Sequence, residues 1–154
     1  MQLKKTSTRP FEVRRSEIQG RGVFATRSIR KGTRLLEYKG EIIDEDEADR
    51  RYPWDDDGPH HTFLFRLEDG NVIDAGPRGN AAKYINHSCD PNCEALEEDG
   101  RIFIEAIRNI RKGEELAYDY NFVLEEPHNA ANKKLYPCYC GTKACRGTML
   151  AKKR

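Results

Sequence analysis

Residues 86–89 place an amide, an imidazole, a hydroxyl and a thiol in consecutive positions, as Asn86, His87, Ser88 and Cys89. Such side chains compete with the backbone for hydrogen bonds, and the Asp-Pro-Asn that follows at 90–92 is typical of a turn. The stretch therefore predicts a loop rather than a helix or a strand. A histidine taken alone is more often structural than functional, but so many different donors and acceptors together indicate that this loop holds something.

The cysteines indicate a metal ion rather than disulfides. Five occur, and three of them are crowded near the C-terminus with the spacing Cys138-x-Cys140-x4-Cys145. An odd number fits a disulfide framework poorly, whereas neighbouring thiolates can converge on one tetrahedral zinc ion. A structural zinc site normally has four ligands, so one more is needed. The candidates for it are Cys89, Cys93 and His128.

Tyrosines form a third group with possible chemistry. Tyr118 and Tyr120 lie in "ELAYDY" at 115–120, and side chains alternate along a strand, so both phenols would point to one face. Tyr38 could join them in an aromatic slot. Two tyrosines on one face are, without other signals, more typical of packing than of catalysis.

The elements expected to position these groups are mostly short strands. Runs rich in β-formers occur at 11–16, 22–25, 34–43, 62–75 and 92–107. The last two contain Asp69-Gly70-Asn71 and Asp99-Gly100, which predict hairpins. A short helix is expected at 44–52, with Asp44 as its N-cap. "RSIRKG" and "RNIRKG", at 27–32 and 108–113, indicate one turn type used twice.

Composition favours one globular domain in a reducing, intracellular compartment, either cytoplasmic or nuclear. The 154 residues are 37% hydrophobic and 34% charged, with no apolar run of the roughly 20 residues that a bilayer span needs. The charged N-terminus does not predict a secretory signal. A net charge of +1 gives little reason to expect direct nucleic-acid binding. Residues 44–57 contain eight Asp or Glu and two Arg, which could attract a basic peptide.

Taken in order, the motifs resemble those of the SET-domain protein lysine methyltransferases. The matching stretches are "GRG" at 20–22, "EYKGE" at 37–41, "NAAKYINHSCDPNC" at 80–93, "EELAYDY" at 114–120 and "CYCGTKACRG" at 138–147. The resemblance spans residues 11–149. It implies a β-clip-like fold of small curved sheets with a knot-like crossing of the last two core motifs. It also implies a SET domain at 11–123 and a zinc-binding post-SET segment at 138–154, while the residue pattern itself predicts a flexible tail at 1–10 and a linker at 124–137.

The resemblance gives the loop at 86–89 two tasks. Asn86 and His87 would bind S-adenosylmethionine, the methyl donor, and Cys89 would complete the zinc site of Cys138, Cys140 and Cys145. The residues that would also contact the donor are Gln19, Arg21 and Gly22, through their backbone, and Phe63.

The activity implied is methyl transfer to a lysine amine in a protein or peptide, such as a histone tail or a non-histone protein. Tyr120 would be the catalytic tyrosine, and Tyr38 would line the lysine channel. Tyr118 occupies a position that holds Phe or Tyr in the family, and a hydroxyl there predicts mainly monomethylation. Oligomeric state is not indicated by the sequence.

The sequence departs from the family pattern in several places. Lys83 and Tyr84 replace an Arg-Phe pair, Phe63 replaces a frequent Tyr that contacts the donor, and no cysteine-rich segment precedes the core. Two other hypotheses remain open at this point. One is a catalytically silent SET-like module that binds a partner through the same groove, and the other is a small β-clip binding domain without stoichiometric zinc.

Overall fold

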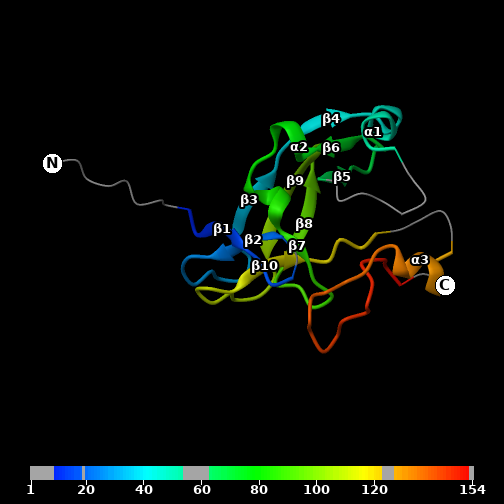
Figure 1. Cartoon of the computed structure of the whole chain (residues 1–154). Helices are drawn as coiled ribbons and strands as arrows, with labels where there is room; N and C mark the ends of the chain where they lie inside the picture. The colour runs from blue at the N-terminus through cyan, green and yellow to red at the C-terminus, as the bar shows by residue number, and fades with distance from the viewer. Residues whose placement is uncertain (1–8, 19, 54–62, 123–126, 153–154) are drawn as a thin grey trace.

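A computed structural model describes residues 9–18, 20–53, 63–122 and 127–152, which form three small β-sheets and a few short helices (Figure 1). The first sheet has the order β1-β2-β10-β7, with β1 at Phe11–Arg15, β2 at Arg21–Ala25, β10 at Glu115–Tyr118 and β7 at Asn86–His87. β7 and β10 pair in parallel, with Ala117 opposite Asn86 and Tyr118 opposite His87. The two motifs that carry most of the candidate chemistry therefore lie side by side.

The other two sheets are antiparallel and contain the predicted hairpins. One has the order β3-β9-β8, with β3 at Arg34–Tyr38, β9 at Arg101–Ala106 and β8 at Cys93–Glu98. The other has the order β4-β6-β5, with β4 at Glu41–Ile43, β6 at Val72–Asp74 and β5 at Leu64–Arg66. Asp99 and Gly100 both have positive φ, as a two-residue turn between β8 and β9 requires. The prediction of a mostly β fold is confirmed.

The predicted helix is also confirmed. α1 runs from Glu45 to Arg51, and the Asp44 side chain accepts a hydrogen bond of 2.8 Å from the backbone N–H of Glu47. Arg51 at its end contacts Glu41 at 3.0 Å and the fully buried Asp74 at 3.1 Å, which fastens α1 to the β4-β6-β5 sheet.

Three further helical turns were not predicted. They are α2 at Ala75–Arg78, the 3-10 turn η1 at Ala81–Tyr84 and α3 at Ala130–Lys134. α3 falls inside the expected linker and buries none of its side chains, so it leaves no apolar period in the sequence. Asn129 caps it by accepting a hydrogen bond from the backbone N–H of Asn132 at 2.9 Å. Its stability therefore comes from local hydrogen bonds.

One main core holds the first two sheets together. β9 alternates exposed or half-buried residues with the fully buried Ile102, Ile104 and Ala106. Val23 of β2 and Leu116 of β10 join the same cluster. β2 pairs with Glu115 and Leu116, so this core fixes the start of β10, the strand that ends at Tyr118 and leads to Tyr120.

The tail after α3 lies on the side of the molecule away from β1 (Figure 1). It is joined to the segment that follows β10 by a bridge between Phe122 and Leu150, in which the Ala151 N–H donates to the Phe122 carbonyl at 2.8 Å. Among the described residues, no helix has the length and apolar character needed to cross a lipid bilayer.

Candidate functional site

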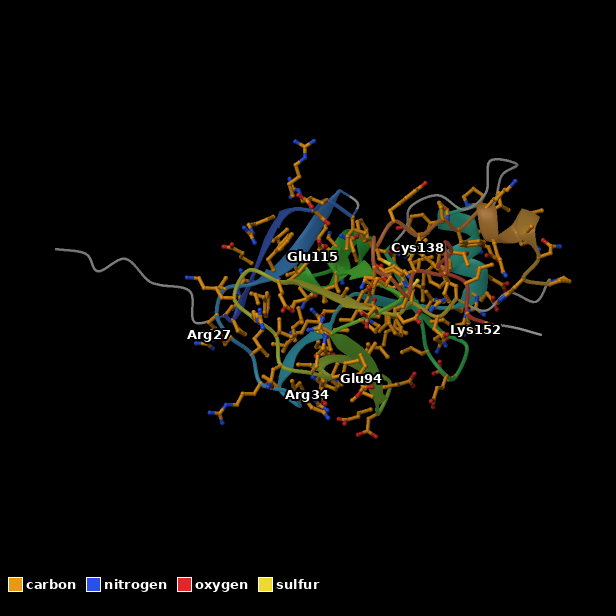
Figure 2. The ribbon with its side chains drawn as sticks, turned by 90° about the horizontal axis from the view of Figure 1, so that it is seen from below. Arg27, Arg34, Glu94, Glu115, Cys138 and Lys152 are labelled. Atoms are coloured by element: carbon orange, nitrogen blue, oxygen red, sulfur yellow. The ribbon has the colours of Figure 1, made fainter. Side chains whose placement is uncertain are left out.

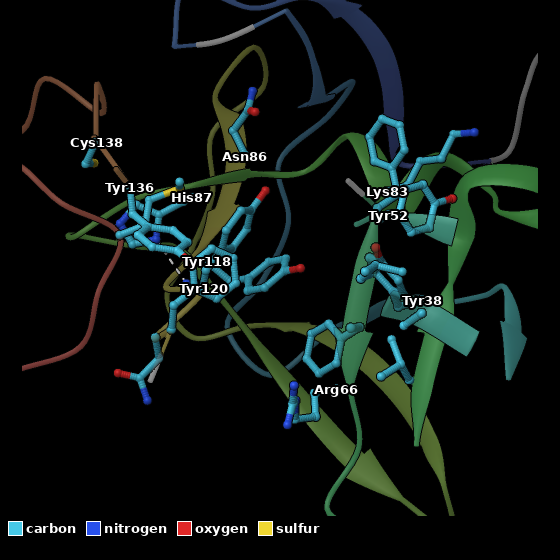
Figure 3. Close-up of a pocket in the computed structure, with 18 of the residues that line it drawn as sticks. Tyr38, Tyr52, Arg66, Lys83, Asn86, His87, Tyr118, Tyr120, Tyr136 and Cys138 are labelled. Carbon is cyan, nitrogen blue, oxygen red and sulfur yellow. Dashed lines mark hydrogen bonds between the residues drawn. The ribbon is translucent and has the colours of Figure 1, made fainter. Parts of the chain in front are cut away.

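A cleft of about 740 Å³ runs between the core strands and the C-terminal tail (Figure 3). Seven of the predicted site residues line it: Tyr38, Phe63, Asn86, His87, Tyr118, Tyr120 and the predicted zinc ligand Cys138. Arg21 and Gly22 lie behind Asn86 rather than in the lining itself. Gln19 lies outside the described residues. The sequence did not predict that Tyr136 and Met149 of the tail and Tyr52 of the α1 end would also contribute to the wall.

Aromatic rings follow one another across this cleft. The ring centroids of Tyr38 and Phe65 are 5.3 Å apart, and those of Tyr118 and Tyr120 are 4.9 Å apart. Phe65 also contacts Tyr118, at 6.3 Å between centroids. Phe65 was not predicted as a site residue, because a phenylalanine in a strand carries no signal beyond packing. The result is a narrow, largely apolar passage edged by three phenols.

Desolvation raises the pKa of the phenols of Tyr38, Tyr118 and Tyr120 above the ordinary value, so each stays protonated at neutral pH. The Tyr120 hydroxyl donates a hydrogen bond to the Ile85 carbonyl, directly before Asn86. The Tyr120 backbone N–H donates to His87 Nδ1 at 3.0 Å. Both ends of Tyr120 are thus held by the 85–87 segment.

The half-buried carboxylate of Glu115 sets the orientation of the Asn86 side chain. The Asn86 Nδ2 lies 2.8 Å from Glu115 Oε2, 3.1 Å from Ser16 Oγ and 3.1 Å from the Arg21 carbonyl. The Ser16 hydroxyl donates to Glu115 as well, at 2.8 Å. Three acceptors around Nδ2 fix which side of the amide carries the nitrogen. Glu115 and Ser16 were missed by sequence reasoning, because nothing in their spacing marks a contact across 99 positions.

Gly22 makes room for this carboxylate. A Cβ at position 22 would lie 2.3 Å from Glu115 Oε2 and 3.0 Å from Ser16 Cβ, closer than real contacts allow. Any side chain there would push Glu115 away from Asn86. The packing of Glu115 is therefore a physical reason for glycine at this position.

His87 connects the cleft to the cysteines. Because its Nδ1 accepts the Tyr120 N–H, the ring proton belongs on Nε2, which lies 3.4 Å from Cys89 Sγ. Burial lowers the pKa of His87 to about 4; Asp119 opposes this shift and Arg146 adds to it. The ring is consequently a neutral donor toward the sulfur.

Four cysteine sulfurs gather beside His87, those of Cys89, Cys138, Cys140 and Cys145, all within 4.8 Å of one another. Cys89 and Cys138 are 3.7 Å apart, close to the ~3.8 Å expected between two sulfurs of a tetrahedral zinc site with bonds of about 2.3 Å. An all-thiol set suits zinc better than magnesium or calcium, which prefer oxygen.

The other two candidates for the fourth ligand lie elsewhere. Cys93 is 1% exposed in the main core, where burial raises the pKa of its thiol to about 12. His128 is buried, with Nδ1 2.7 Å from the Ala151 carbonyl. Among the described residues, neither belongs to the group of converging ligands.

Arg146 closes a ring of contacts between the cysteines and Tyr120. Its backbone N–H donates to Cys89 Sγ at 3.3 Å, and its guanidinium donates two hydrogen bonds to Asp119, at 2.8 and 3.0 Å. Asp119 directly precedes Tyr120 and lies 3.6 Å from His87 Nδ1. Starting at Cys89, the ring thus runs through His87, Asp119 and Arg146 and returns to the same sulfur.

Comparison with known proteins agrees with this geometry. The pattern of the SET domain matches residues 20–121. The chain is 45% identical over 148 residues to the human protein "Histone-lysine N-methyltransferase 2B", an alignment that covers 94% of this chain and 5% of that protein.

Two other relatives are similarly close. "Histone-lysine N-methyltransferase trithorax" of Drosophila virilis is 41% identical, over 94% of this chain and 4% of that protein. "Histone-lysine N-methyltransferase, H3 lysine-4 specific" of Neurospora crassa is 40% identical, over 95% of this chain and 11% of that protein. The chain therefore spans only a small part of the length of these curated relatives. Since the matched pattern covers most of the chain, from the first sheet to the end of the tyrosine motif, the protein belongs to the SET domain family.

Proposed function

We propose that this chain transfers a methyl group from S-adenosylmethionine to the side-chain amine of a protein lysine, with a histone tail as the first candidate substrate. One observation carries the proposal: the passage edged by Tyr38, Tyr118 and Tyr120 opens beside Asn86 and His87 in one cleft. The relatives' names support the reaction, and the Neurospora name makes the tail of histone H3 the first to test. A histone substrate implies a nuclear location.

The cleft fits such a donor. Its volume of about 740 Å³ lies within the range of small-molecule sites, roughly 300–1,000 Å³. Aromatic faces attract cations, so the rings of Tyr118, Tyr120 and Phe122 suit a positively charged ligand. Bound there, S-adenosylmethionine supplies an electrophilic methyl group on a sulfonium ion. The chain itself would need no nucleophile, because the neutral lysine amine would take the methyl group as the carbon–sulfur bond breaks and the donor leaves as a neutral thioether.

The tyrosines prepare the incoming lysine. A narrow aromatic passage disfavours the charged ammonium by desolvation, which lowers the pKa of the lysine and favours the neutral amine. The Tyr120 hydroxyl, fixed against Ile85, orients that amine, and Tyr38 closes the passage. Catalysis of this kind rests on positioning and electrostatics.

Zinc is proposed for the four thiolates, with Cys89 joining the tail to the loop that bears Asn86 and His87. The role of the metal is structural, because four protein ligands leave no open position for substrate. Its binding would hold Tyr136 and Met149 of the tail against the cleft.

The direct test is transfer of tritiated methyl from S-adenosylmethionine to a panel of histones and other proteins, followed by mapping of the labelled lysine. Titration calorimetry with the donor separates this proposal from a silent module, which would not bind it. Metal analysis separates it from a simple β-clip domain, which would carry no stoichiometric zinc.

Tyr120→Phe removes one hydroxyl while keeping the ring, and we expect kcat to fall about 10²- to 10³-fold, the usual effect of losing one well-placed donor. Zinc content should stay unchanged. Tyr52→Phe is the matched control, since it removes another hydroxyl from the same cleft, one bonded to Asp74 at 3.0 Å. Equal turnover of the Tyr120 variant and the parent would remove Tyr120 from the catalytic role.

Tyr118→Phe should change the product. The Tyr118 hydroxyl can hold a water beside the amine and leave less room for a methylated one, so we propose that the parent makes mainly monomethyl-lysine. The variant should shift mass spectra of the product toward di- and trimethyl-lysine. Trimethyl product from the parent would contradict this role.

Arg146→Met should leave the four thiols available to zinc but remove the two hydrogen bonds that the Arg146 guanidinium donates to Asp119. Partners that orient metal ligands typically contribute 10- to 100-fold to activity, and we expect a loss of kcat of that order per bound zinc, partly restored by Arg146→Lys. Arg101→Met is the control, since Arg101 makes a similar two-bond pair with Glu37 and neither residue lines the cleft. A variant that loses only thermal stability, with unchanged kcat per zinc, would assign Arg146 a purely structural role.

Removal of zinc by a chelator should weaken donor binding, measured by calorimetry. The metal would no longer fix Cys89, which lies only two residues after the proposed donor-binding residue His87. Re-addition of zinc should restore the affinity. Donor affinity that is the same with and without the metal would show that the tail and the donor site act independently.

A further inference from the structure

The two "R-x-I-R-K-G" turns at 27–32 and 108–113 are joined into one rigid surface. Ile29 and Ile110 are buried and pair with each other through two backbone hydrogen bonds, both of 2.8 Å. Asn109 adds a third link by accepting from the Lys31 N–H at 2.9 Å. The sequence repeat thus places two basic turns that differ at one position side by side in the fold.

All the basic side chains of these turns are exposed. We name as the basic pole the six residues Arg27, Arg30, Lys31, Arg108, Arg111 and Lys112. One carboxylate, Glu114, lies among the lining residues and contacts Arg108 at 3.3 Å. Six positive charges and this negative one give +5, so with a whole-chain charge of +1 the remainder carries +1 − 5 = −4. The near-neutral net charge therefore hides a strong separation of charge.

Three residues of the basic pole lie along an open hollow of about 600 Å³. Arg30 of the first turn and Arg108 and Arg111 of the second line it, together with Asn109. Guanidinium groups from two sides can donate paired hydrogen bonds to a phosphate, for which arginine has the matching planar geometry. Within the described part of the chain, no residue lines both this hollow and the cleft that holds Tyr120.

We infer that the basic pole binds the phosphate backbone of duplex DNA. A cluster of exposed arginine and lysine on one face is the electrostatic footprint of backbone binding, which needs no contact with the bases. This inference rests on the proposed histone substrate. The basic pole would bind the DNA that accompanies histones in chromatin while the cleft binds the histone. Figure 2 shows Arg27 of the pole at the left edge of the folded part and Cys138 of the tail right of its centre, so the two surfaces are separate and can be occupied together.

The test compares two triple variants that remove the same charge. Arg30→Gln/Arg108→Gln/Arg111→Gln alters the pole, and Arg14→Gln/Arg50→Gln/Arg101→Gln alters exposed arginines elsewhere, each paired with a carboxylate. Fluorescence anisotropy with a labelled 25-base-pair duplex gives Kd as a function of salt. We expect the parent to bind with Kd of about 10⁻⁴–10⁻⁶ M, as non-specific binders do.

The pole variant should bind at least about tenfold more weakly, and its slope of log K against log salt should be shallower by about 2 to 3, since each phosphate contact contributes about 0.9. The control variant should keep the parent slope. The inference would be overturned if the two variants had equal slopes or if the parent did not bind at 50 mM salt. It would also be overturned if polyglutamate displaced the labelled duplex as effectively as unlabelled duplex does.

A second measurement separates this inference from the proposed function. Methylation of nucleosomes should fall in the pole variant while methylation of a free histone-tail peptide stays at the parent rate. A parent chain that methylates neither substrate would refute the proposed function, and the anisotropy result would still decide the pole. Equal loss on both substrates would show that the pole acts on the fold or the cleft and not through DNA.

Discussion

The short parallel pairing of β7 with β10 brings His87 against the end of the tyrosine motif, and the rest of the site is built around this contact. Nδ1 of the ring receives the Tyr120 N–H, and Nε2 faces Cys89. One imidazole thereby touches both the aromatic passage and the cysteine cluster. Arg146 makes the same connection from the other direction, through Asp119. The tail, the loop and the end of the tyrosine motif are thus joined by side-chain contacts.

The charged groups of this molecule are unevenly distributed, and the net charge does not show it. The walls of the passage hold neutral phenols, whose pKa values are raised by desolvation. Arg51 neutralises the buried Asp74 beneath α1, and Asp119 and Arg146 neutralise one another near the cysteines. These inner charges are paired, and the basic side chains of the two turns are gathered on one exposed surface. A total of +1 describes neither region, which is why net charge alone did not predict the basic pole.

Features carried by a short stretch of sequence were predictable, because their physics is local. The α1 cap at Asp44 and the Asp99-Gly100 turn follow from propensity within a few residues. The proximity of the four cysteines came from the resemblance. Contacts between distant segments were not predictable. Glu115 approaches Asn86 and Ser16 only because β10 lies beside β7 and pairs with β2 in one register. No spacing rule encodes that register.

The first sheet also has a consequence for how the protein is made. β2 pairs with β10, and Ser16 contacts Glu115, which lies 99 positions further along the sequence. Such distant partners slow folding, because a long loop must close before the pairing stabilises it. Until synthesis has passed residue 118, β2 presents an unsatisfied edge and the apolar side chain of Val23 to its surroundings. The nascent chain is therefore most prone to aggregation in that interval.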